Sequence, residues 1–144
     1  FSTYGIYWKW LRFGGDFPKY VINYREREGF TVEQWRNYQN QQLTQLLKLA
    51  CERVPYYRSH WTEDQKRAAQ NGELSQLPLL AKAEIRSQPV QFSRDDVHPL
   101  HLKHFLTSGS TGTPIETIWT VPEVRDSLAV REVRSANWAM PAPC

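Results

Sequence analysis

The middle of the chain carries a helical pattern of hydrophobic positions. From Trp35 onward, larger side chains recur at close to the i, i+3, i+4 spacing of one buried helix face, at Tyr38, Leu43, Leu46, Leu47, Ala50 and Val54. Thr31 and Gln34 precede this run with the spacing of a capping box, in which the hydroxyl accepts a backbone N–H and the amide side chain reaches back. The pattern predicts a helix that starts at Thr31 and that Pro55 ends, followed by a rigid aromatic corner at Tyr56-Tyr57-Arg58.

Two shorter helices are predicted downstream. Thr62 and Gln65 repeat the capping-box spacing, and their helix should stop at Asn71-Gly72 because glycine readily takes the left-handed conformation. After the apolar connector Leu77-Pro78-Leu79-Leu80, a third helix is expected over residues 82–87, although Ala81 offers no side-chain oxygen for its cap.

After Pro89 the chain changes to short segments of β character. His101 to Leu106 and Ile115 to Thr120 predict two strands separated by a run of small residues. Thr120 and Glu123 form a third capping box, and the helix that follows should run towards Trp138, with helical spacing at Val124, Leu128 and Arg131. The residue pattern therefore divides the chain into an aromatic-rich segment (1–30), a helical region (31–88) and a β-loop-β-α region (89–144).

Composition and charge exclude several classes of protein. With 144 residues, 40% of them hydrophobic and 23% charged, the chain has the balance of one globular domain. Its net charge of +3 is spread along the chain, so we expect no nucleic-acid partner. Cys51 and Cys144 have neither a metal-site spacing nor a disulfide framework, which favours a reducing, cytoplasmic location. No apolar run approaches the ~20 residues of a membrane span.

The aromatic stretch from Tyr7 to Phe13 has two interpretations. It is interrupted by Lys9 and Arg12, and aromatic rings with cationic side chains suit the headgroup region of a membrane surface. The same residues also suit packing against a protein body, which is the interpretation we favour.

The segment that carries chemistry is Thr107-Ser108-Gly109-Ser110-Thr111-Gly112-Thr113-Pro114. Its two glycines allow positive φ, so successive N–H groups can point into one concavity that binds an anion, and its hydroxyls add further donors. An uncharged loop that binds its ligand in this way suits a polyphosphate, because magnesium bound to the polyphosphate neutralises part of its negative charge. It is not a Walker A loop, because Thr113-Pro114 follows Gly112 where that motif needs Lys and Ser or Thr. An ordinary surface loop is the alternative.

Other candidate sites are weaker. His98, His101 and His104 suggest a metal, but on a strand His101 and His104 face opposite sides, so we predict no metal site. Asp95-Asp96 is interpreted as a solvated pair beside a turn.

The loop string resembles the phosphate-binding signature of the adenylate-forming (AMP-binding) superfamily, which includes acyl-CoA synthetases, luciferases and peptide-synthetase adenylation domains. Segments that precede the loop look like the phenylacetate-CoA ligase branch, in particular its relatives in capsular polysaccharide biosynthesis and coenzyme F390 synthesis. These segments are Leu46-Leu47 through Ala50, Arg53-Val54-Pro55-Tyr56-Tyr57-Arg58 and Leu77-Pro78-Leu79-Leu80. The similarity covers roughly Gln34 to Trp138.

The resemblance implies a fold and a reaction. The fold would be an incomplete α/β N-terminal domain, helical at first and then strand, phosphate loop, strand and helix. The parent enzyme would use ATP and Mg²⁺ to convert a small-molecule carboxylate to an acyl-adenylate, and would then form a thioester with CoA. By this analogy the phosphates would be bound by Thr107, Ser108, Gly109, Ser110, Thr111, Gly112 and Thr113.

The chain differs from the family pattern after the loop, and several of the family's functional segments are expected beyond its last residue. Ile115-Glu116 follows Pro114, where many members have a basic residue. The adenine-binding segment, the ribose-binding acidic residue and the catalytic lysine would lie beyond Cys144, so no catalytic residue is assigned. We therefore expect the isolated chain to be inactive, to bind ATP weakly at best, and to expose apolar surface that favours self-association.

A hypothesis from another class stands beside the enzyme. The chain would then be a non-catalytic helical interaction module, with the Ser/Thr/Gly-rich loop as a connector and the aromatic N-terminal segment as its contact surface.

Overall fold

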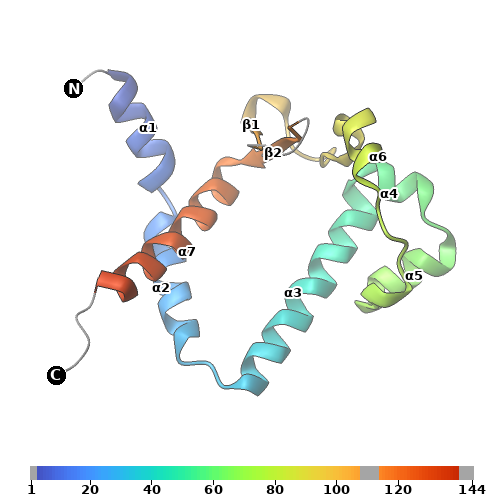
Figure 1. Cartoon of the computed structure of the whole chain (residues 1–144), viewed down its shortest axis with the longest axis horizontal. Coiled ribbons are helices and arrows are strands. Elements are labelled where there is room, and N and C mark those ends of the chain that lie inside the picture. Colours follow the sequence, from blue (N-terminus) through green and yellow to red (C-terminus); the bar gives the residue numbers. More distant parts are fainter. Residues whose placement is uncertain (1–2, 108–113, 140–144) are drawn as a thin grey trace. The chain divides into compact units, whose positions relative to one another are not determined.

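The computed structural model describes residues 3–107 and 114–139 (Figure 1). Over these residues the chain is mostly helical with one small two-stranded antiparallel sheet, so it is α/β only in a loose sense. The helices and strands are α1 (Thr3–Phe13), α2 (Phe17–Glu28), α3 (Val32–Arg53), α4 (Pro55–His60), α5 (Glu63–Asn71), α6 (Lys82–Ser87), β1 (Leu102–Leu106), β2 (Glu116–Thr120) and α7 (Val121–Ala139). Short 3₁₀ turns are η1 (Leu74–Gln76), η2 (Pro89–Phe92) and η3 (Pro99–His101).

Contacts group these elements into two units. One unit joins the segment up to Phe30 to the segment from Trp119 onward, and the other runs from Thr31 to Ile118.

The predicted capping boxes are confirmed. At the start of α3, Gln34 N donates to Thr31 Oγ1 at 3.2 Å and Thr31 N donates to Gln34 Oε1 at 2.8 Å. Thr62 and Gln65 make the same reciprocal pair at the start of α5. The end of α5 is also as expected, because Gly72 caps it in the left-handed conformation with φ +81°.

Two details of the prediction for this region are wrong. Pro55 does stop α3, but it also opens α4, so the aromatic corner at 56–58 is helical. Proline is well suited to a first helical turn because its missing N–H has no intrahelical partner there. Leu46 does not belong to the buried face, since it is 60% exposed while Leu47 is buried.

The core of the 31–118 unit forms where α3 and α5 pack together. Its buried residues are Leu47, Ala50, Cys51, Trp61 and Ala69, with Leu43, Tyr57 and Leu77 packed against them. Burial raises the pKa of the Cys51 thiol, so this side chain stays protonated and serves as a small apolar group.

The other unit is built from α1, α2 and α7, and its first two helices occupy a segment where the sequence pattern predicted none. Helix α7 packs against α2 and α1 (Figure 1). Its buried positions are Arg125, Ala129 and Val133, and Leu11 of α1 is 2% exposed. The predicted capping box is present, because Thr120 N donates to Glu123 Oε2 at 2.6 Å and Glu123 N donates to Thr120 Oγ1 at 3.4 Å.

No helix in the described ranges combines the length and apolarity that crossing a bilayer requires.

Candidate functional site

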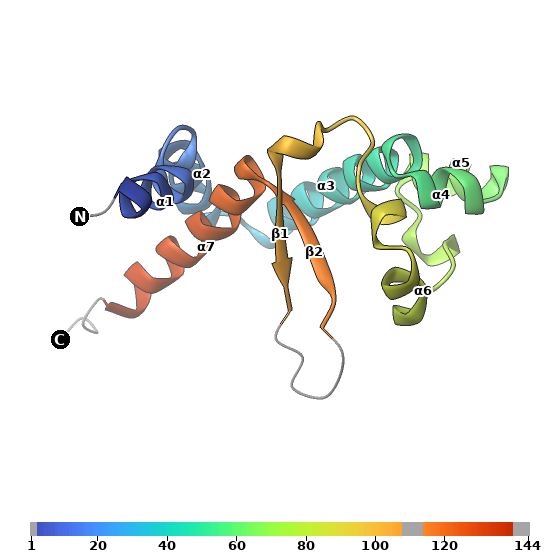
Figure 2. The ribbon, with the colours of Figure 1, turned by 90° about the horizontal axis from the view of Figure 1, so that it is seen from above.

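The two strands predicted on either side of the glycine-spaced loop are present within a residue of their expected bounds. Figure 2 shows β1 and β2 side by side as a ladder of their own. Thr117 Oγ1 donates to the carbonyl oxygen of Phe105 at 3.2 Å, which places these two residues next to each other across the ladder. The strands therefore bring the two ends of the loop together.

The loop is closed at its base by Thr107 and Ile115. Thr107 N donates to Ile115 O at 2.9 Å, and Ile115 N donates to Thr107 Oγ1 at 2.9 Å. The hydroxyl of this predicted phosphate ligand therefore accepts a hydrogen bond within the chain and fixes the neck of the loop. The other predicted ligands, Ser108, Gly109, Ser110, Thr111, Gly112 and Thr113, lie outside the described residues.

One acidic side chain lies just beyond the loop and has a partner. The carboxylate of Glu116 meets His104 across the ladder, with Oε1 2.8 Å from Nδ1. When His104 is protonated, it offsets the negative charge that Glu116 places near the loop.

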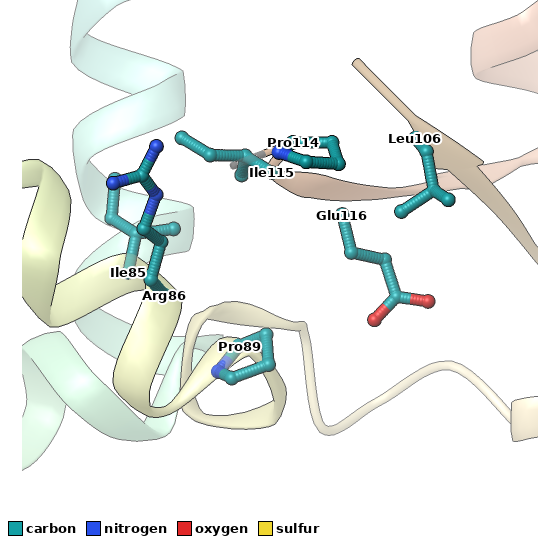
Figure 3. A pocket seen from close by; sticks show the side chains of 7 residues that line it. All are labelled: Ile85, Arg86, Pro89, Leu106, Pro114, Ile115 and Glu116. Atoms are coloured by element: carbon teal, nitrogen blue, oxygen red, sulfur yellow. The ribbon is translucent and has the colours of Figure 1, made fainter. Parts of the chain in front are cut away.

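A shallow pocket of about 330 Å³ adjoins the base of the loop (Figure 3). Ile85, Arg86 and Pro89 contribute from α6 and η2, and Leu106, Pro114, Ile115 and Glu116 contribute from the hairpin. Its walls are mainly apolar, with the guanidinium of Arg86 on one side and the carboxylate of Glu116 on the other.

The wall formed by α6 and η2 is attached to α4 through Tyr56. The hydroxyl of Tyr56 hydrogen-bonds the carboxylate of Glu84 in α6, and this bond raises the pKa of the Tyr56 phenol. The ring of Tyr56 also stacks on Phe92 at 4.2 Å between centroids. These contacts fix the part of the pocket that lies far from the loop in sequence.

The remaining candidate residues have other partners. Asp95 pairs with Arg58 at 2.7 Å and Asp96 with Arg94 at 2.8 Å, so these acidic residues are ion-paired rather than simply solvated. The rings of His98 and His101 lie 6.1 Å apart. Within the described ranges, no three His, Cys, Asp or Glu side chains are arranged to hold a metal ion.

Sequence reasoning found the loop but missed its surroundings. The contribution of α6 and η2 carries no local signal, because Ile85 and Pro89 lie more than a dozen residues upstream of the hairpin. The pairing of His104 with Glu116 could have been sought, since opposite charges on adjacent strands are a known stabilising arrangement.

Comparisons with protein-family models, curated proteins and solved structures return no match to this chain. The loop residues and the hairpin that carries them are therefore the features from which a function can be inferred.

Proposed function

We propose that this chain supplies the phosphate-binding part of an enzyme that activates a carboxylic acid with ATP. In the reaction, a carboxylate oxygen attacks the α-phosphorus of ATP, the bond to the bridging oxygen breaks, and pyrophosphate leaves as the acyl-adenylate forms. Transfer of the acyl group to the thiol of CoA would release AMP. The supporting observation is a glycine-spaced hydroxyl loop whose neck is closed by two hydrogen bonds between Thr107 and Ile115.

The proposed role of the loop is positioning and charge stabilisation. Backbone N–H groups and hydroxyls would donate to the β- and γ-phosphate oxygens, and each such bond to a charged oxygen contributes about 1.5–3 kcal/mol. The loop holds no general base, so the rate would depend on orienting the triphosphate and on stabilising the charge of the leaving pyrophosphate. A closed neck serves this role because it limits the conformations that the loop must lose on binding.

Glu116 is the feature that weakens such a site, and His104 is its hydrogen-bond partner. A carboxylate close to a polyphosphate is unfavourable, but its hydrogen bond to His104 gives it a partner within the hairpin. The Mg²⁺ that accompanies ATP would lower the remaining repulsion.

Nuclear magnetic resonance titration of the ¹⁵N-labelled chain with Mg·ATP tests the proposal. We expect binding in the millimolar range, about −4 kcal/mol, with amide shifts concentrated between Thr107 and Ile115. AMP should give much smaller shifts, because it lacks the β- and γ-phosphates. Gly112→Val should abolish the response, since a β-branched residue resists positive φ and blocks close approach.

Gly29→Val provides the matched control, because Gly29 has a φ of −84° and lies in the other unit. Equal shifts with ATP and AMP, or ATP shifts scattered over surface cations and unaffected by Gly112→Val, would favour the connector loop of the interaction module. In a longer protein that contains this chain, wild-type ATP–pyrophosphate exchange by Gly112→Val would contradict the phosphate role.

A further inference from the structure

Helix α1 exposes a continuous apolar sector. Ile6 is 63% exposed and Trp10 61%, and Tyr7 and Phe13 are each 47% exposed. Residues three and four apart are neighbours on a helix surface, so Trp10 lies between the other three side chains. The result is one connected patch of three aromatic rings and an isoleucine.

The opposite face of α1 is already used within its own unit. Leu11 is buried, and α1 packs on α7. Arg125 of α7 donates to the carbonyl oxygens of Leu11 and Trp10, at 3.0 and 3.3 Å. The helix is therefore held by Leu11 and by Arg125, and Trp10 keeps 61% of its surface exposed although its ring centre lies 5.2 Å from the Arg125 guanidinium.

The charged side chains of α1 are all positive. Lys9 and Arg12 are exposed, and the chain has no acidic residue before Asp16. Lys9 lies three positions after Ile6 and four before Phe13, so its ammonium group flanks the apolar sector. Asp16 is itself paired with Lys19, with 3.1 Å between Oδ1 and Nζ.

From this arrangement we infer that α1 binds an anionic lipid surface, with its axis in the plane of the membrane. Aromatic rings lie favourably at headgroup depth, and Lys and Arg are attracted to anionic headgroups. Eleven residues make a helix of about 16 Å, which is too short to cross a bilayer and suited to lying on it. This inference is independent of the proposed ATP-dependent activity.

The charge pattern favours lipid over a second copy of the chain. In a two-fold pairing of α1 through this sector, Lys9 would approach its own copy without an acidic residue of α1 to pair with. An anionic surface against the apolar sector places a complementary charge against Lys9, while the guanidinium of Arg12 lies 5.3 Å from the Trp8 ring and adds to the positive charge of the helix.

Co-sedimentation of the 144-residue chain with vesicles tests this inference. We expect binding to vesicles of phosphatidylcholine and phosphatidylserine (about 70:30), little binding to phosphatidylcholine alone, and weaker binding as salt increases. Ile6→Ser with Trp10→Ser should lower the partition coefficient at least about tenfold, as should Lys9→Glu with Arg12→Glu.

Matched variants in the other unit provide controls for both changes. Leu46→Ser with Leu79→Ser also removes two exposed apolar side chains, and Arg36→Glu with Lys48→Glu makes the same change in net charge on exposed positions of α3. These controls should bind as the wild type does. Far-UV circular dichroism checks that the variants keep their helices, and the charge variant remains decisive if the apolar variant unfolds.

Three outcomes would overturn the inference. The first is equal binding to both kinds of vesicle. The second is a loss in the controls as large as the loss in the α1 variants. The third is a wild-type chain that does not bind vesicles but forms a dimer in sedimentation velocity. If Ile6→Ser with Trp10→Ser dissociates that dimer, the apolar face of α1 binds a second copy of the chain.

Discussion

The guanidinium of Arg125 donates to the carbonyl oxygen of Leu11, a residue 114 positions earlier in the chain. Its second bond is to Trp10 O, which also accepts a bond from Gly14 N at 2.8 Å. The cation also lies 5.2 Å from the centre of the Trp10 ring. One buried side chain of α7 therefore caps the C-terminal end of α1.

Replacing this cap should destabilise the unit that contains α1. Arg125→Met keeps a long side chain but removes the charged donor to the carbonyl oxygens of Leu11 and Trp10, of which Trp10 O keeps its bond from Gly14 N, so the free energy of unfolding should fall by about 2 kcal/mol. Arg131→Met, at an exposed position of the same helix, should change it by less than about 0.5 kcal/mol. Urea denaturation followed by circular dichroism measures both, and equal effects would disprove the capping role.

Gly72 should not tolerate a side chain. Its φ is +81°, and a Cβ there would collide with Oγ1 of Thr44, so Gly72→Ala should destabilise the chain by about 1–3 kcal/mol. Gly29→Ala is the control, since Gly29 has a negative φ and its Cβ would only touch Glu26 O at 3.7 Å. That substitution should be neutral or slightly stabilising in thermal denaturation.

A double-mutant cycle separates the two causes at Gly72. Thr44→Ala removes the colliding hydroxyl and leaves the backbone conformation unchanged, so it should recover part of the loss caused by Gly72→Ala. Complete recovery would show that the left-handed conformation contributes nothing, contrary to our argument.

Capping boxes explain how much of the fold the sequence could predict. Thr31, Thr62 and Thr120 each mark a helix start through two local hydrogen bonds, so the signal needs no knowledge of tertiary structure. The first two helices lack such signals. Asp16 makes no side-chain cap bond to α2, and of the large aromatic side chains of α1 only Trp8 is half-buried, while Tyr4, Tyr7, Trp10 and Phe13 are exposed.

Helix α7 shows a second limit of pattern reasoning. The sequence pattern indicated helical spacing at Val124, Leu128 and Arg131. The buried positions in the described part of α7 are instead Arg125, Ala129 and Val133. Arginine and alanine carry little hydrophobic signal, and Arg125 is buried because distant carbonyl groups accept its hydrogen bonds. The candidate site shows the same limit. Its loop can be recognised in the sequence, but its neck depends on the pairing of β1 with β2, and its pocket wall depends on the packing of α6 and η2.

The neck of the loop should open when the Thr107 hydroxyl is removed. Thr107→Val deletes the acceptor for Ile115 N, so hydrogen exchange of the Ile115 amide should accelerate about fivefold, which corresponds to about 1 kcal/mol. Thr107→Ser keeps the acceptor and should exchange as the wild type does. Thr117→Val is the control, because it removes a nearby hydroxyl that bonds Phe105 O. Equal acceleration by Thr117→Val would show that the Thr107 hydroxyl has no specific role.

Acid should weaken the contact between Asp96 and Arg94. Arg94 donates from Nε at 2.9 Å and from Nη2 at 2.8 Å, and these bonds hold the pKa of the Asp96 carboxyl below its ordinary value. Because the pKa in the folded state lies below that in the unfolded state, about 3.9, the stabilisation is complete above that pH and is lost as pH falls through the folded value. Asp96→Asn should therefore reduce stability at pH 7 and flatten its decline below pH 5.

Thermal denaturation between pH 7 and pH 3 measures this effect. Asp64→Asn is the control, because Asp64 meets Arg67 through one contact of 3.1 Å and its side chain is 88% exposed, so screening by water leaves that pair little influence. Its melting temperature should follow the wild-type pH profile. If Asp96→Asn follows that profile too, the paired hydrogen bonds of Arg94 do not stabilise the folded state, and the 93–96 segment is held by other contacts, such as the bond from Asp95 N to Arg53 O at 2.9 Å.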